Sequence, residues 1–179
     1  MCQDDDMSVE IVSGDLFESR AQTLVNAVNC VGVMGKGIAL EFKRRYPDMF
    51  TDYVRRCNDG TVKPGLPYIY KHGWSPRISV KGPWILNFPT KRHWRDPARL
   101  DDIIAGLDYV RRHCYDWAVT SMAVPALGVG NGGLDWDVVL PVLQEYLARL
   151  QGIEVKIFEP LAEMNLCRRT AEGVQGPCL

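Results

Sequence analysis

The feature that most limits the folds open to this chain is the alternation of short apolar segments with longer amphipathic ones. Strands alternating with helical crossovers predict a largely parallel sheet with helices on both faces, so we expect an α/β fold. Strand-like patterns occur at 8–14, 23–29, 84–89, 121–126 and 155–160, with a further short strand near LPYIYKH (66–72). Helices are predicted for a short segment that Pro47 ends, and for 48–58, 98–115 and 136–150.

The length of 179 residues suits one domain, which we place at 8–160. Residues 1–7 are expected to form a disordered lead-in, and 161–179 a loosely held tail. The net charge of −1 predicts no overall attraction to nucleic acid. There is no apolar run of roughly 20 residues and no secretory signal, so we expect a cytoplasmic protein without a membrane contact.

Cysteine and histidine are too scattered to indicate a disulfide framework or a zinc site. We therefore expect no metal and no cofactor. Cys30 lies inside a glycine-rich loop, where it is either a catalytic thiol or, as we favour, a small packed residue.

The first glycine-rich stretch, AVNCVGVMGKGIALEF (27–42), lies between a predicted strand and a predicted helix. Its glycines at 32, 35 and 37 allow the backbone to approach a ligand closely. The helix that begins near Gly37 presents unpaired N–H groups to a phosphate. The spacing is neither the dinucleotide fingerprint nor the phosphate loop of nucleotide hydrolases, so a tight turn without a ligand is the alternative.

The second glycine-rich stretch, PALGVGNGGLDWD (125–137), also follows a strand and precedes a helix. Glycines at 128, 130, 132 and 133 provide backbone donors that can hold a diphosphate. Asp135 is either a functional acid or the N-cap of the next helix. Two such loops predict a ligand with a central diphosphate and a group at each end.

The order GDLF, TLVNAVNCVGVMGKGIALEFKRRYP, NFPTKRHW and AVPALGVGNGGLDW resembles the macrodomains over about 8–160. The resemblance implies a three-layer α/β/α sandwich with a mixed, largely parallel central sheet. More narrowly, the chain resembles the antitoxin macrodomains that remove ADP-ribose from thymidine bases in DNA. It resembles less closely the glycohydrolase that removes terminal ADP-ribose from glutamate side chains. An ADP-ribosyltransferase toxin and ADP-ribosylated single-stranded DNA are the implied partners.

The resemblance also implies which residues contact ADP-ribose. Asp15 would accept a hydrogen bond from the adenine amino group. Asn26 and Asn29 would face the ribose, with loop ordering as the alternative for Asn26. The remaining implied contacts are Leu16, Gly32, Val33, Met34, Gly35, Lys36, Gly37, Pro89, Thr90, Leu127, Gly128, Gly130, Asn131, Gly132, Gly133 and Leu134.

Lys91, in the NFPTK motif, matches the lysine that the related glycohydrolases use at the anomeric carbon. Its amine must be neutral to attack C1″, so its pKa must be lowered by desolvation or by cations such as Lys36, Arg92 or His93. Binding a phosphate as a cation is the alternative role. The glutamate-directed enzyme pairs its lysine with an aspartate, and this chain has Gly132 there. Catalytic support would then come from His93, Asp135 or a water.

The segment KRHWRDPAR (91–99) combines cations with an aromatic ring, as contacts to single-stranded DNA require. We predict DNA contacts by Arg92, Trp94 and Arg95. A solvated basic turn with Trp94 packed on the core is the alternative.

Three functions therefore remain open. The favoured one is hydrolysis of ADP-ribose from a DNA base. The others are release of ADP-ribose from protein glutamate or from its 1″-phosphate, and binding of ADP-ribose without catalysis. The chain is either a piece of a longer antitoxin or a stand-alone version.

Overall fold

The computed structural model describes residues 9–72, 74–75, 78–79 and 82–160. The lead-in predicted at 1–7 and the tail predicted at 161–179 lie outside the described residues.

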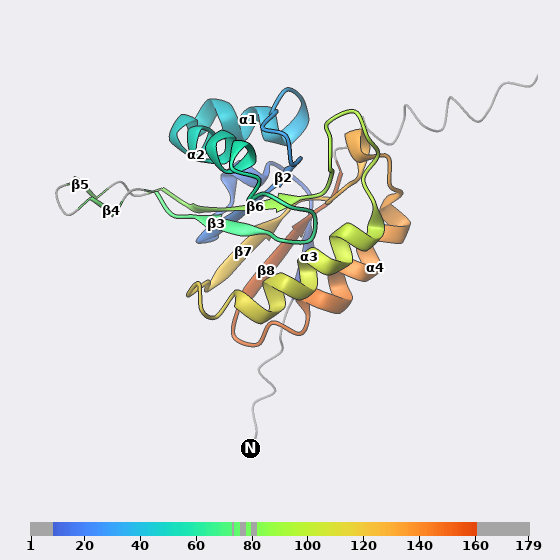
Figure 1. The fold of residues 1–179 in the computed structure, drawn as a ribbon. Coiled ribbons are helices and arrows are strands. Elements are labelled where there is room, and N and C mark those ends of the chain that lie inside the picture. Colours follow the sequence, from blue (N-terminus) through green and yellow to red (C-terminus); the bar gives the residue numbers. More distant parts are fainter. Residues whose placement is uncertain (1–8, 73, 76–77, 80–81, 161–179) are drawn as a thin grey trace, which may run out of the picture.

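A six-stranded sheet forms the centre of the fold (Figure 1). Its strand order is β1-β8-β7-β2-β6-β3, and neighbouring strands are parallel except β3, which pairs antiparallel with β6. This is the mixed, largely parallel sheet that was predicted. The strands are β1 Val9–Val12, β2 Thr23–Val28, β3 Tyr68–Tyr70, β6 Trp84–Pro89, β7 Ser121–Val124 and β8 Glu154–Phe158. Two further short strands, β4 Trp74–Ser75 and β5 Ile78–Ser79, pair with each other and were not predicted.

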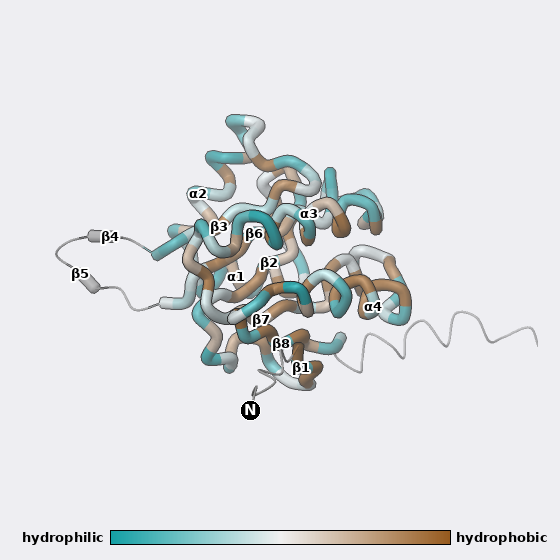
Figure 2. The backbone as a smooth tube through the Cα atoms, turned by 90° about the horizontal axis from the view of Figure 1, so that it is seen from below, coloured by the Kyte–Doolittle hydropathy of each residue, from teal (hydrophilic) through white to brown (hydrophobic). Residues whose placement is uncertain are grey.

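Helices cover both faces of the sheet, as the three-layer prediction requires (Figure 1). Helices α1 (Gly37–Arg45) and α2 (Pro47–Asn58) pack with Leu24, Ile85 and other strand residues in one core cluster. Helices α3 (Leu100–His113) and α4 (Trp136–Leu147) pack in a second cluster on the opposite face. Figure 2 shows the hydrophobic stretches along β7 and β8, between these helical layers.

The predicted helix boundaries agree with the structure to within a few residues. Helix α1 ends at Arg45, and Pro47 starts α2 at a first-turn position, where its missing N–H costs nothing. Helix α3 is two residues shorter at each end than the predicted 98–115. Helix α4 ends three residues before the predicted Leu150.

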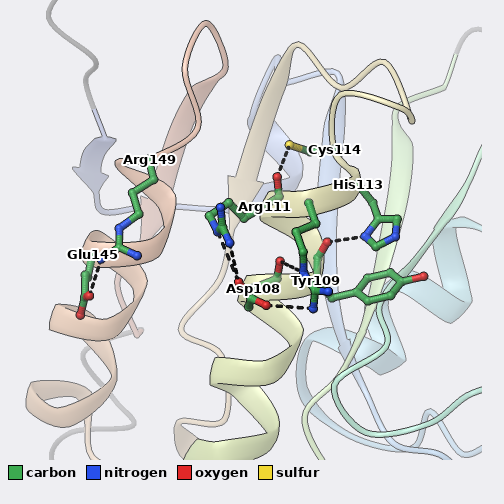
Figure 3. A network of polar contacts seen from close by, with 8 residues as sticks. Asp108, Tyr109, Arg111, His113, Cys114, Glu145 and Arg149 are labelled. Atoms are coloured by element: carbon green, nitrogen blue, oxygen red, sulfur yellow. Dashed lines mark hydrogen bonds and ion pairs between the residues drawn. The ribbon is translucent and has the colours of Figure 1, made fainter.

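Ion pairs between residues three or four positions apart lie along α3 and at the end of α4 (Figure 3). Arg111 lies 2.8 Å from Asp108, and Arg149 lies 2.7 Å from Glu145. Exposed pairs of this kind contribute little to stability because water and salt screen them. They also neutralise these arginines, so this surface offers few free cations. Within the described residues, no helix is long and apolar enough to cross a bilayer.

Candidate functional site

Three segments leave the carboxyl ends of neighbouring parallel strands and meet at one edge of the sheet. Loop 1 (29–37) follows β2, the lysine segment (90–99) follows β6, and loop 2 (125–135) follows β7. Ligands bind at this edge in open α/β sheets. The β2–β6 pairing continues past the strand ends, because the Thr90 amide donates to the Val28 carbonyl at 2.9 Å and the Cys30 amide to the Arg92 carbonyl at 3.3 Å. Loop 1 and the lysine segment therefore run side by side.

Asn29 holds loop 1 in shape. Its Nδ2 donates to the Val33 carbonyl at 2.5 Å, and its Oδ1 accepts from the amides of Val31 and Val33 at 3.0 and 3.3 Å. The Tyr53 hydroxyl of α2 donates to the same Oδ1 at 2.9 Å. In this structure both polar atoms of the Asn29 side chain bond within the protein, and the expected ribose contact of Asn29 remains a prediction.

Asn26 is fully buried, with 0% of its surface exposed. Its Nδ2 donates to Oδ1 of Asn87 at 3.0 Å and approaches Sδ of Met34 at 3.9 Å. These contacts fit the loop-ordering alternative, and the expected ligand contact of Asn26 remains a prediction. Asn87, which was not predicted as a site residue, stands opposite Asn26 in the β2–β6 register. Asn26 and Asn87 each lie two residues before the end of their own strand, and this shared position is the sequence signal that could have identified the pair.

Gly37 joins loop 1 to helix α1 and brings loops 1 and 2 into contact. Its φ of +57° lies in the left-handed region that favours glycine. A Cβ on Gly37 would lie 3.0 Å from Nδ2 of Asn131 in loop 2. Lys36 occupies the N-cap of α1, and its side chain makes no hydrogen bond to the first amides of the helix. Glycine at this position allows the two loops to approach closely beside a helix N-terminus.

Loop 2 uses several of its own amides. Those of Gly132, Gly133 and Leu134 donate to the carbonyls of Val129, Gly130 and Gly128, at 3.4, 3.0 and 3.0 Å. In this structure the amides of Gly132 and Gly133 bond within loop 2, and the expected diphosphate contacts of these two glycines remain predictions. Gly128 is required by packing, since a Cβ there would lie 2.6 Å from Cδ1 of Ile103.

Lys91 reaches across to loop 2, where its Nζ donates to the Asn131 carbonyl. The side chain is half-buried, and this burial lowers the pKa of the Lys91 amine below its ordinary value of 10.5. The negative charge of Asp96 acts in the opposite direction and raises that pKa. Desolvation, and not the cations Lys36, Arg92 and His93, is the cause of the lowered pKa.

The groups considered as catalytic support have different surroundings. A Cβ on Gly132 would lie 4.0 Å from Cε of Lys91, so a side chain at 132 would face the lysine. Asp135 occupies the N-cap of α4, where its carbonyl accepts from Val138 and Val139. His93 accepts a hydrogen bond from the Arg95 amide at Nδ1, which leaves Nε2 as its other proton-transfer atom.

The residues expected at the adenine end include Asp15, which is exposed beyond the end of β1. Its Oδ1 accepts from the Phe17 amide at 2.9 Å and caps the 3₁₀ turn Leu16–Glu18. The side chains of Leu16, Met34, Leu127 and Thr90 are buried.

Arg92 anchors the lysine segment to α3. Its Nη2 and Nε lie 3.1 and 3.2 Å from the two carboxylate oxygens of Asp102, whose side chain is only 11% exposed. Asp102 was not predicted, because this pairing spans ten residues and depends on how the segment folds back. The pairing gives Arg92 a structural role, and its DNA contact remains a prediction.

Cys30 is a half-buried residue of loop 1, close to Cys57. Burial, with the nearby Cys57 and Asp102, raises the pKa of the Cys30 thiol to about 11. The thiolate needed for nucleophilic attack is therefore scarce at neutral pH. This supports the packed role over the catalytic one. In the described part of the chain, no three His, Cys, Asp or Glu side chains group as a metal site.

Comparison with known proteins agrees with this geometry. The family model described as Macro domain matches residues 25–143. The chain belongs to the macrodomain family. It is 47% identical over 165 residues to the DNA ADP-ribosyl glycohydrolase of Mycobacterium tuberculosis, covering 92% of this chain and 44% of that protein. This macrodomain chain thus spans less than half the length of that curated relative.

Two solved structures are similar to the macrodomain described here. The macrodomain of Mycobacterium tuberculosis DarG has a TM-score of 0.80 and 46% identity, covering 86% of this chain and 98% of that one. Thermosipho africanus DarTG in complex with ADP-ribose has a TM-score of 0.79 and 39% identity, covering 87% of this chain and 43% of that one. The predicted macrodomain fold is confirmed.

Proposed function

We propose that this macrodomain binds ADP-ribose between loops 1 and 2 and hydrolyses the bond that links it to a DNA base, most simply thymidine. In this role it would act in the cytoplasm as the antitoxin to an ADP-ribosyltransferase that modifies DNA. The names of its relatives support the proposal, since one is a DNA ADP-ribosyl glycohydrolase and another structure contains ADP-ribose.

The observation that carries the proposal is the position of the Lys91 amine. It projects from the end of β6 to the Asn131 carbonyl, at the place where loops 1 and 2 approach each other. Its burial lowers its pKa, so a larger neutral fraction exists than for an exposed lysine. A purely ADP-ribose-binding protein has no need of a neutral amine there.

The chemistry follows from that amine. Cleavage of a glycosidic bond passes through an oxocarbenium-like centre at C1″. The neutral Lys91 amine donates its electron pair to C1″ as the bond to the base breaks, and the bonding electrons leave with the base. The Lys91 nitrogen then passes a proton to the departed base. Water attacks C1″ and returns a proton to that nitrogen as the bond between C1″ and nitrogen breaks. The products are ADP-ribose and the unmodified base, and the reaction consumes one water.

A DNA base suits the glycine at position 132, where the glutamate-directed enzyme has an aspartate. A thymine leaving group spreads its negative charge over the ring, so it needs less proton donation than a poorer leaving group. Gly132 places no carboxylate against Lys91, and Nε2 of His93 or a water is left to carry protons. The same gap makes release from protein glutamate the weaker alternative.

The test compares Lys91→Ala with Lys63→Ala, an exposed lysine outside all three segments. Each variant is incubated with an ADP-ribosylated thymidine oligonucleotide and with an ADP-ribosylated glutamate peptide. We expect Lys91→Ala to abolish release from the oligonucleotide while calorimetry shows ADP-ribose affinity within a few-fold of wild type. Lys63→Ala should behave as wild type.

Three results would contradict the proposal. Wild-type release from the peptide alone would assign a protein substrate. Tight ADP-ribose binding without release from either substrate would make the macrodomain a reader. Activity retained in Lys91→Ala would remove the proposed nucleophile.

A further inference from the structure

The tip of the lysine segment presents an aromatic ring to solvent. The Asp96 amide donates to the His93 carbonyl at 3.1 Å, which closes a turn with Trp94 and Arg95 at its two central positions. Trp94 is 45% exposed and belongs to neither core cluster. The alternative in which Trp94 packs on the core is therefore excluded.

This turn is held rigidly from both sides. Before it, the Arg92 carbonyl accepts from Cys30 of loop 1, and the Arg92 guanidinium pairs with Asp102 of α3. After it, the Ala98 amide donates to the Gly132 carbonyl of loop 2 at 2.7 Å. A surface that is fixed before binding loses little freedom when a partner docks. The exposed ring is thus placed by the same loops that frame the candidate site.

The chemistry at the tip combines a flat ring with a cation. The Arg95 guanidinium carbon lies 4.5 Å from the centroid of the Trp94 ring, and the His93 ring stacks at 5.4 Å with an interplanar angle of 29°. Within the described residues, Arg92 has a carboxylate partner and Arg95 has none. A cation without an acidic partner beside a stacking ring suits a phosphate next to an unpaired base.

We infer that Trp94 and Arg95 form a stacking platform for a base that neighbours the modified nucleotide on a single DNA strand. Trp94 lies three residues after Lys91, so their Cα atoms are at most about 11 Å apart. This separation suits an adjacent nucleotide better than the modified base itself. The inference rests on the proposed function, and it assigns Arg92 to positioning and leaves contact to Trp94 and Arg95.

A base inside a duplex cannot use this platform. Its two faces are covered by neighbouring bases, whereas an unpaired base can swing out and stack on a side chain. The macrodomain would therefore prefer single-stranded DNA through stacking, with little preference for sequence. Every base has a flat face, and no base-edge contact is required.

The experiment compares Trp94→Ala, Trp94→Phe and Arg95→Ala with the control Arg20→Ala, an exposed arginine before β2. Two substrates are used, ADP-ribosylated thymidine as a nucleoside and the same group inside a single-stranded oligonucleotide. We expect Trp94→Ala to raise KM for the oligonucleotide about ten-fold. KM for the nucleoside and the affinity for ADP-ribose should stay unchanged. Trp94→Phe should recover most of the loss, and Arg95→Ala should raise KM and flatten its salt dependence.

Equal effects of Trp94→Ala on both substrates would overturn the platform, and so would no effect on either. A separate measurement follows the anisotropy of an unmodified, fluorescein-labelled single-stranded oligonucleotide. If the wild type released ADP-ribose from neither DNA substrate, the proposed function would fail. Weaker oligonucleotide binding by Trp94→Ala than by Arg20→Ala would still support the platform. Equal binding by these two variants would refute it.

Discussion

Placing a carboxylate at position 132 tests where the Lys91 amine lies. A Cβ at 132 would lie 4.0 Å from Cε of Lys91, so the carboxylate of Gly132→Asp would lie roughly 5 Å from the amine. At that separation the attraction is about 1 kcal/mol in water and about 3 kcal/mol at an effective dielectric constant of 20. This attraction favours the protonated amine and raises its pKa. Because Lys91 is only half-buried, we expect the lower part of that range, a rise of about one pKa unit.

The matched control is Gly132→Asn, which has the same shape without the charge. Both side chains crowd Ala98, whose Cβ would lie 3.1 Å from the new Cβ, so the comparison cancels that steric effect. The assay is the pH dependence of kcat/KM on the modified oligonucleotide. Below the pKa, the neutral fraction of the amine falls about ten-fold for each unit that the pKa rises.

We therefore expect Gly132→Asp to be about ten-fold slower than Gly132→Asn at pH 7. The two variants should converge at high pH, where the amine is neutral in both. Identical pH profiles would refute the reasoning, because they would mean that position 132 does not face the amine or that the neutral amine is not needed.

Two further predictions concern Asp96 and Gly106. Asp96→Asn removes a charge that raises the pKa of Lys91, so the rise of kcat/KM with pH should shift to lower pH, and an unchanged or alkaline-shifted profile would contradict this. Gly106→Ala on α3 would place a Cβ 2.4 Å from Cζ of Phe88 in β6, so urea unfolding should show a loss of about 1–3 kcal/mol from overpacking. The control Ala105→Gly makes the reverse substitution at an exposed position of the same helix, and it should cost about 1 kcal/mol through helix propensity alone. A stabilised Gly106→Ala would show that helix propensity outweighs packing at this position.

Local patterns were enough to predict the layers of this fold. The apolar run before each glycine-rich loop predicted β2 and β7, and Pro47 correctly marked the break between α1 and α2. These features depend on residues close together in the sequence. The antiparallel edge strand β3 and the sheet order depend on long-range pairing, which no local pattern encodes.

The candidate site was predictable in outline and less so in side-chain roles. The strand ends brought the three predicted segments together, because parallel strands share one edge for their carboxyl ends. The bonds that Asn29 makes to its own loop were not predicted, since an asparagine after a strand can face a ligand or its own backbone with equal ease. Asp102 and Asn87 were missed because each is defined by a partner on another element.

Asn29 and Tyr53 give loop 1 a shape that is maintained from within the protein. Ordering a backbone residue costs about 1–2 kcal/mol of conformational entropy, and a loop that is already ordered avoids this cost on binding. The affinity for ADP-ribose should therefore depend on the contacts that loop 1 makes with the ligand, without a deduction for ordering the loop. The same stiffness sets a limit, since a bulkier ligand would have to break the hydrogen bonds around Asn29. Discrimination between substrates is then left to loop 2 and the lysine segment.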